Sequence, residues 1–422
     1  MTTVALLNLG CAKNRIDGER ILSSFRRSGY RVVDDFNRAE IIVVNTCAFI
    51  QEAKEEAIES ILSMVSCKEE GRCSTLVVAG CFSQRYRQQI TKEFPEVNLW
   101  LGTDQWEQEF AGYFKSRVTK SFDRILCAPF STQYLKISEG CSQMCSFCAI
   151  PSIRGPFRSR LAEDCIAEAQ WLEHQGVREC ILVSQDTTSY GKDRNTSLSR
   201  LLEQLLAKTT ISWIRLMYLF PGRIDDSLLQ LIAGEPRICS YFDIPFQHIS
   251  DRILKSMKRR PLSKGIHELI DRIRKYVPDA TLRSSFILGY PHETARDFKE
   301  LLSFVETTRF DRVGVFTFSP EEGTPAFGMR PRPGKSTARR RADMLMDIQR
   351  DISRQKRAGE QGWVHDVIID RQATQKGFAW EGRTQGDAPE VDGRVFISQG
   401  NYAPGDIVPV QIIGSDDHDL FA

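Results

Sequence analysis

The stretch SEGCSQMCSFCAIP, residues 138–151, places three cysteines within eight residues. Cys141, Cys145 and Cys148 follow a short apolar run, which predicts that they lie in a loop after a β-strand. A structural zinc site needs four ligands, and the next cysteine, Cys165, lies inside an amphipathic helical pattern. Iron–sulfur clusters are held by thiolates, one per iron. The spacing therefore favours a 4Fe–4S cluster with one iron open to a small molecule; zinc or no metal is the alternative.

The whole chain has 422 residues, which is too long for one hydrophobic core and predicts two or three domains. The N-terminus lacks the pattern of a secretory signal, and no apolar stretch approaches the roughly 18 residues of a membrane span. We therefore expect a cytoplasmic protein with no membrane partner. In that compartment twelve cysteines are poor candidates for disulfides, so metal ligation explains some of them better.

Three regions differ in their hydrophobic pattern and predict an α/β chain of three domains. Residues 1–120 alternate short apolar strands with amphipathic helices, which predicts an open parallel α/β domain. Residues 127–355 repeat this rhythm with six strand-like runs, two short of a closed barrel, which predicts a partial (β/α)6 barrel. Residues 359–422 contain short β runs separated by turn residues, which predicts a small all-β barrel.

A second set of cysteines ends three successive strands of the first region: Cys11, Cys47 and Cys81. Ligands of open α/β sheets bind beyond the carboxyl ends of the strands, where parallel neighbours would bring these thiols together. We interpret them as ligands of a second iron–sulfur cluster, with buried structural cysteines as the alternative. An insertion before the third strand adds Cys67 and Cys73 as other candidates for the third ligand, although Cys81 has the better position.

The loop of residues 138–151 resembles the motif of the radical S-adenosylmethionine superfamily, Cys-x3-Cys-x-aromatic-Cys after a first barrel strand. Membership implies that the amino and carboxylate groups of S-adenosylmethionine bind the open iron. It also implies that one electron from the cluster cleaves this cofactor to a 5′-deoxyadenosyl radical, which abstracts hydrogen from carbon. In such enzymes the cofactor carries the difficult chemistry, and the protein supplies orientation and excludes water.

This resemblance also implies cofactor contacts outside the cysteines. Phe147 occupies the aromatic position that packs against adenine, although ordinary core packing is the alternative. Gln185 and Asp186 end the second barrel strand, where related enzymes hold the ribose and amino group; Asp186 could instead cap the next helix. An arginine could bind the methionyl carboxylate through two N–H groups. Further candidates, each with a structural alternative, are Gln247, His248 and Arg283.

Taken together, the motifs resemble the radical methylthiotransferase family over essentially the whole chain. LGCAKNRID, VVNTCAFI and VAGCFSQRY are similar to its N-terminal domain, SEGCSQMCSFCAIPSIRGPFRSR to its cluster loop, EEGTPA to the end of its barrel, and the last region to a TRAM domain. The resemblance implies two 4Fe–4S clusters, one that makes the radical and one that carries the sulfur. It also implies S-adenosylmethionine as methyl donor and radical source, and an electron donor.

The substrate class depends on the last region, because this family modifies either an adenosine of tRNA or an aspartate of a small-subunit ribosomal protein. Residues 359–422 hold four basic and eleven acidic residues, a formal charge of −7, so the preceding residues carry +9 of the chain's net +2. Such a domain would repel RNA and attract a basic partner. GRTQGDAPEVDG and QDTTSYG also resemble the ribosomal protein branch. We therefore expect a basic ribosomal protein (S-twelve) as substrate, with tRNA as the alternative.

Two residues depart from the family pattern in TLRSSFILGYPHET. Ser284 and His292 stand where the motif has threonine and glycine. Because His292 follows a strand end, it is expected to crowd or contact the cofactor.

Overall fold

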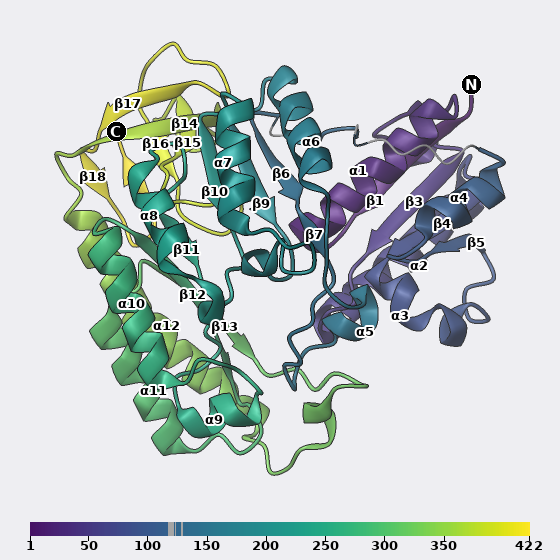
Figure 1. The fold of residues 1–422 in the computed structure, drawn as a ribbon. Coiled ribbons are helices and arrows are strands. Elements are labelled where there is room, and N and C mark those ends of the chain that lie inside the picture. The colour runs from purple at the N-terminus through teal and green to yellow at the C-terminus, as the bar shows by residue number, and fades with distance from the viewer. Residues whose placement is uncertain (117–121, 123, 128–129) are drawn as a thin grey trace.

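The computed structural model describes residues 1–116, 122, 124–127 and 130–422, and it shows three units of the predicted kinds (Figure 1). The predicted boundary at residue 120 lies outside the described residues. The α/β class and the three architectures are confirmed. Among the described residues, no helix combines the length and apolar character that a membrane span requires.

The N-terminal unit is a parallel sheet of five strands in the order β2-β1-β3-β4-β5. Its strands are β1 (Thr3–Asn8), β2 (Arg31–Val32), β3 (Ile41–Thr46), β4 (Thr75–Gly80) and β5 (Val97–Leu101). Its helices are α1 (Ala12–Arg27), α2 (Gln51–Glu70), α3 (Cys81–Ile90) and α4 (Trp106–Phe114). The central strand β3 is buried at every residue, as expected for a sheet with helices on both faces. The strand order reverses between β1 and β3, and such a switch point is where open sheets bind ligands.

The central unit is a partial barrel of six parallel strands that follow one another in chain order. The strands are β6 (Thr132–Lys136), β9 (Glu179–Val183), β10 (Trp213–Leu216), β11 (Tyr241–Asp243), β12 (Thr281–Leu288) and β13 (Arg312–Thr317). A bridge between Ile214 and Ile238 joins the two halves. The helices on its outer face are α6 (Ala162–His174), α7 (Leu198–Lys208), α8 (Asp226–Gly234), α10 (Ser263–Tyr276) and α11 (Ala295–Thr308). The short helix α9 (Asp251–Ser256) lies at the carboxyl ends of the strands, where Ile253 packs beside Tyr290.

The C-terminal unit follows α12 (Lys335–Ala358) and is a curled antiparallel and parallel sheet in the order β17-β14-β15-β16-β19-β18. Its strands are β14 (Val364–Gln372), β15 (Trp380–Arg383), β16 (Val395–Ile397), β17 (Ile407–Gln411), β18 (Gly414–Ser415) and β19 (Leu420–Phe421). The two edge strands, β17 and β18, are separated in the chain by only Ile412 and Ile413. The chain therefore passes from one edge of the sheet to the other, which curls the sheet around its apolar core.

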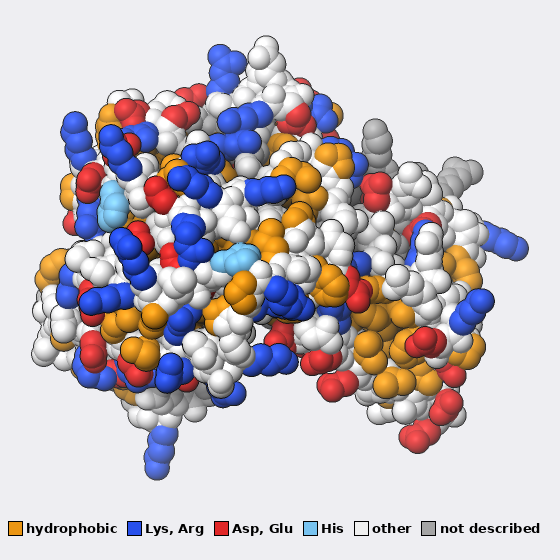
Figure 2. Space-filling view, turned by 90° about the horizontal axis from the view of Figure 1, so that it is seen from below, with side chains coloured by type: hydrophobic (Ala, Val, Ile, Leu, Met, Phe, Trp, Pro, Cys, Tyr) orange, Lys and Arg blue, Asp and Glu red, His pale blue; other side chains and the backbone are white. Residues whose placement is uncertain are grey.

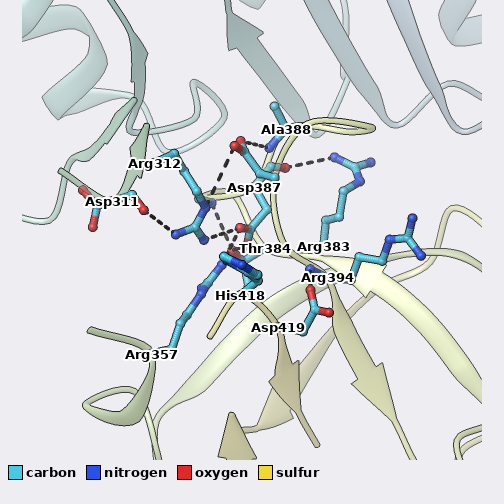
Figure 3. A network of polar contacts seen from close by, with 12 residues as sticks. Asp311, Arg312, Arg357, Arg383, Thr384, Asp387, Ala388, Arg394, His418 and Asp419 are labelled. Carbon is cyan, nitrogen blue, oxygen red and sulfur yellow. Dashed lines mark hydrogen bonds and ion pairs between the residues drawn. The ribbon is translucent and has the colours of Figure 1, made fainter. Parts of the chain in front are cut away.

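Buried ion pairs dock the C-terminal unit on the barrel (Figure 3). Asp387, which is fully buried, accepts hydrogen bonds from Arg312 of β13 and from Arg357 of α12, each at 2.5 Å. Nearby, Asp392 accepts from the hydroxyl of Tyr241 at 2.6 Å. Each carboxylate leaves water only because a partner replaces its hydration.

This docking changes the interpretation of the acidic composition. Five acids of the C-terminal unit pair with arginines that lie outside it: Glu360, Asp387, Glu390, Asp392 and Asp417. Two more, Asp370 and Glu381, pair within the unit. Most of the charge that suggested a docking surface for a basic substrate is therefore neutralised inside the protein.

Replacing Asp387 with alanine should destabilise the protein by about 3–5 kcal/mol, because the buried Arg357 and the partly exposed Arg312 would each lose an ion pair with a buried carboxylate. The measurement is the urea dependence of unfolding, followed by the fluorescence of the tryptophans. Asp366→Ala is the control, since Asp366 is exposed and is expected to change stability by less than about 0.5 kcal/mol. Equal midpoints for the two variants would contradict the docking role.

Candidate functional site

The loop with Cys141, Cys145 and Cys148 is held by a short hairpin, β7 (Ser138–Glu139) with β8 (Arg158–Ser159), and contains helix α5 (Ile150–Arg154). Gly140 lies in the left-handed region with φ of +75°, and a Cβ there would lie 2.2 Å from the backbone oxygen of Pro156. Only glycine fits this close approach. The loop is thus pinned where the first barrel strand ends.

The surroundings of these thiols suit bound thiolates. The backbone N–H of Gln143 donates to Sγ of Cys141 at 3.4 Å, and the Arg259 guanidinium donates to Sγ of Cys145 at 3.7 Å. Burial, followed by the charge of neighbouring groups, raises the pKa of Cys141 to about 11 and that of Cys148 to about 12. Without a metal ion these two thiols stay protonated at neutral pH, so metal binding would release their protons.

The second set of cysteines lies at the carboxyl ends of three neighbouring strands, as predicted. Strand pairing places Asn8 beside Asn45 and Thr46 beside Gly80, so Cys11, Cys47 and Cys81 follow adjacent strand ends. Two of these cysteines follow a glycine, whose missing side chain allows neighbouring strand ends to lie close together. A Cβ on Gly10 would lie 2.8 Å from Cβ of Cys47, and one on Gly80 would lie 2.5 Å from the backbone oxygen of Thr46.

Charged groups surround this second set. Burial raises the pKa of Cys47 to about 12, with the neighbouring Cys81 adding to the effect. For Cys11, burial opposes ionisation, yet the positive charges of Lys13 and Arg154 lower the pKa of the thiol. Lys13 in turn lies over the ring of Tyr218, 3.5 Å from its centroid, at the end of a barrel strand. The N-terminal site therefore faces the barrel.

The other two candidate thiols lie elsewhere. Cys67 is in the last turns of α2, and Cys73 is buried before the amino end of β4, where its thiol donates to the backbone oxygen of Thr75 at 3.3 Å. Within the described residues, no three His, Cys, Asp or Glu side chains are arranged to hold a single metal ion. A cubane cluster instead spreads its thiolates over separate irons. Both three-cysteine sets have the donor chemistry that such clusters require.

Arg154 connects the two cysteine sites. It ends helix α5, next to the cluster loop, and is 4% exposed. Its guanidinium donates to Sγ of Cys81 at 3.3 Å, to Asp17 at 2.7 Å and to Asn14 at 3.2 Å. The guanidinium also lies 3.3 Å from the carboxylate of Glu139. This carboxylate forms a second ion pair with the ammonium group of Lys136 at 2.7 Å. Sequence reasoning missed this network, although its members are in or beside the quoted motifs.

The candidates after the second barrel strand contact the cluster loop. The amide of Gln185 donates to Glu139 at 3.0 Å. Asp186 accepts from the backbone N–H of Ser189 at 3.2 Å and so caps a 3-10 turn, and it also accepts from the side chain of Gln143 at 3.0 Å. The capping alternative for Asp186 is therefore observed, on a residue that also holds the loop. Cofactor contacts for this pair stay predictions.

Three further candidates have partners inside the protein. Phe147 packs against the apolar cluster around Tyr290. His248 is buried, and its Nδ1 accepts from the backbone N–H groups of the next two residues; burial lowers its pKa to about 4, so it is neutral. Arg283 pairs with Asp243 at 2.8 Å. Its position is about 16 Å before the carboxyl end of β12 at 3.3 Å per residue, so the structure does not bring it to the cluster loop.

Gln247 and His292 lie beyond the carboxyl ends of their strands, whereas Ser284 lies in the amino-terminal half of β12. Gln247 has φ of +76°, and its backbone bridges to β12 through hydrogen bonds with Ser285 and Ile287. His292 is exposed, with φ of +67°, a conformation that glycine adopts without strain. Ser284 is fully buried, and its hydroxyl donates to the backbone oxygen of Ile244 at 2.9 Å. The hydroxyl therefore serves strand pairing.

Family models match three consecutive parts of the chain. The Uncharacterized protein family UPF0004 matches residues 3–102, the Radical SAM superfamily residues 135–305 and the TRAM domain residues 362–422. Among solved structures, the radical S-adenosylmethionine methyltransferase TsrM from Kitasatospora setae has a TM-score of 0.60 at 13% identity, covering 78% of this chain and 77% of TsrM. That likeness concerns the fold alone.

Curated relatives match almost the full length. The ribosomal protein uS12 methylthiotransferase RimO of Trichlorobacter lovleyi is 42% identical, covering 99% of this chain and 97% of the relative. The protein of the same name from Aquifex aeolicus is also 42% identical, covering 99% and 96%. With this identity over the whole chain and the radical SAM fold, the protein belongs to the RimO family of radical S-adenosylmethionine methylthiotransferases.

Proposed function

We propose that this protein adds a methylthio group to the β-carbon of an aspartate in ribosomal protein uS12. The observation that carries the proposal is the pair of three-cysteine sets at the carboxyl ends of parallel strands, linked by Arg154, which follows the loop of Cys141–Cys148 and donates to Sγ of Cys81. The relatives of the same length are named as uS12 methylthiotransferases, which supports this substrate over tRNA. A ribosomal substrate also supports a cytoplasmic location.

Each cysteine set would hold one 4Fe–4S cluster. Cys141, Cys145 and Cys148 would hold the radical-generating cluster; the sulfur-donating cluster would be held by Cys11, Cys47 and Cys81. When bound, the clusters and S-adenosylmethionine supply the radical, the sulfur and the methyl group, and an electron donor supplies the reducing equivalents. Cys81, Cys141 and Cys145 are buried, and each accepts an N–H···S hydrogen bond, which favours thiolates bound to a cluster at these positions.

The protein's own residues position these groups. Arg154 holds α1 of the N-terminal unit to the cluster loop, and its positive charge lies at Cys81. Gln143 and Asp186 fix the other side of the loop to the second barrel strand. The two sites are therefore kept in one fixed orientation, which transfer from one to the other requires.

Protein purified without oxygen should contain about eight irons and eight sulfides per chain, four per cubane cluster. The triple variants C11A/C47A/C81A and C141A/C145A/C148A should each retain about four, measured by iron and sulfide analysis. Wild-type protein with about four irons would contradict the second cluster. Cys73→Ala, a cysteine outside both sets, is the control and should leave the iron content unchanged.

Replacing Arg154 with alanine should lower the reduction potential of the N-terminal cluster, because a positive charge and an N–H···S bond to Cys81 are removed. Methylthiolation should fall at least about tenfold, while reductive cleavage of S-adenosylmethionine persists. Redox titration followed by electron paramagnetic resonance measures the potential. Arg158→Ala, an exposed arginine of the same hairpin, should behave as wild type; equal potentials in wild type and Arg154→Ala would contradict the role.

The substrate is tested by mass spectrometry after incubation with reconstituted enzyme, S-adenosylmethionine and reductant. The expected result is a methylthio mass gain on one aspartate of uS12 and none on tRNA. A gain on tRNA alone would overturn the proposed substrate. Replacement of that aspartate by asparagine in uS12 supplies the matched control and should abolish the gain.

A further inference from the structure

The exposed side of α2 carries an acidic and apolar stripe, here called the α2 face. Phe49, Ile58 and Leu62 are 40%, 37% and 52% exposed. The glutamates between them are also exposed, and residues spaced by three or four share one side of a helix. The α2 face consists of Phe49, Glu52, Glu55, Glu56, Ile58, Glu59 and Leu62. In Figure 2 the N-terminal unit, at the right, shows hydrophobic side chains gathered with acidic ones beside them.

The charge of the α2 face is not neutralised locally. Helix α2 contains six glutamates and two lysines. Lys54 pairs with Glu321 of the barrel at 3.1 Å, and Lys68 donates to the backbone oxygen of Glu96 and to Asn98, both at 2.6 Å. Within the described residues, Glu52, Glu56 and Glu59 have no ion pair. An acidic side chain in the first turn is stabilised by the helix dipole, which explains Glu52. The dipole does not explain why Glu59, further along the helix, lies beside the exposed side chains of Ile58 and Leu62.

The α2 face begins beside the N-terminal cysteine set and the loop that follows β13. Helix α2 starts four residues after Cys47. The backbone N–H of Gln51 donates to the hydroxyl of Ser319 at 3.4 Å, and Lys54 reaches Glu321, two residues further along the loop that follows β13. A protein bound along α2 would therefore have a segment of its chain at the carboxyl ends of the barrel strands.

We propose that the α2 face is the docking surface for the basic protein substrate. The proposal rests on the proposed function, because a ribosomal protein supplies the lysines and arginines that match these glutamates. Ile58 and Leu62 would be covered by the aliphatic parts of those side chains. A polyanion such as tRNA would be repelled by the same face. The acids of the C-terminal unit are mostly paired internally, so they do not provide the same attraction.

The test is the kinetics of uS12 methylthiolation by the reconstituted full-length variant E52Q/E56Q/E59Q. Loss of three exposed charges should raise KM for uS12 about tenfold and change kcat little. The increase is limited because each exposed ion pair between enzyme and substrate contributes only a small binding free energy. The wild-type KM should rise with salt, and the variant's KM should depend on salt less. I58S/L62S should raise KM without changing the salt dependence. The matched control is D366N/D406N/D416N, three exposed acids of the C-terminal unit, which should behave as wild type.

The outcomes separate the inference from the proposed function. Wild-type enzyme that leaves uS12 unmodified would overturn both. Wild-type activity with an unchanged KM in E52Q/E56Q/E59Q would overturn the docking surface alone. A raised KM in the C-terminal control, with none in the α2 variant, would also overturn it and assign docking to the last unit. Circular dichroism and iron content equal to wild type would show that the variants remain folded and loaded.

Discussion

The buried guanidinium of Arg154 is the contact on which the arrangement of the two cysteine sites depends. It leaves the cluster loop, crosses to the N-terminal unit and meets Cys81, Asp17 and Asn14 there. A guanidinium suits this position because its planar set of donors can serve several acceptors at once and keeps its charge when buried. The carboxylates of Asp17 and Glu139 compensate that charge, with Lys136 completing the network. This network thus holds the N-terminal unit and the cluster loop of the barrel together.

The same principle attaches the C-terminal unit, with the signs reversed. Its carboxylates, led by Asp387, are held by arginines of the barrel and of α12. Acidic residues therefore serve two different purposes in this chain. In the last unit most of them form ion pairs with arginines, whereas on α2 the glutamates are exposed and several have no ion pair among the described residues. Composition cannot distinguish them, because it does not record which charges face each other.

Much of the fold was predictable from local patterns. The strands before Cys11, Cys47 and Cys81 are mainly continuous apolar runs, which parallel buried strands produce. The barrel strands carry more polar residues, and β12 alternates between half-buried and buried positions. The prediction of three strands in the first region did not include β2, which has two residues. The short strands β15, β18 and β19 have two to four residues and are defined by their partners rather than by their own sequence. The prediction for the first region also did not include β5, whose burial pattern is irregular.

The sequence by itself determined the chemistry: two sets of three thiols, the glycines that let strand ends approach, and an α/β chain that places them at carboxyl ends. These features are local or follow from parallel pairing, so spacing is enough to find them. Only the tertiary structure decided which charged groups serve these sites. In the structure, Arg154 contacts the thiol of Cys81, whereas Arg283 lies away from the cluster loop and pairs with Asp243. Ion pairs join residues far apart in the chain, and no local pattern records their partners.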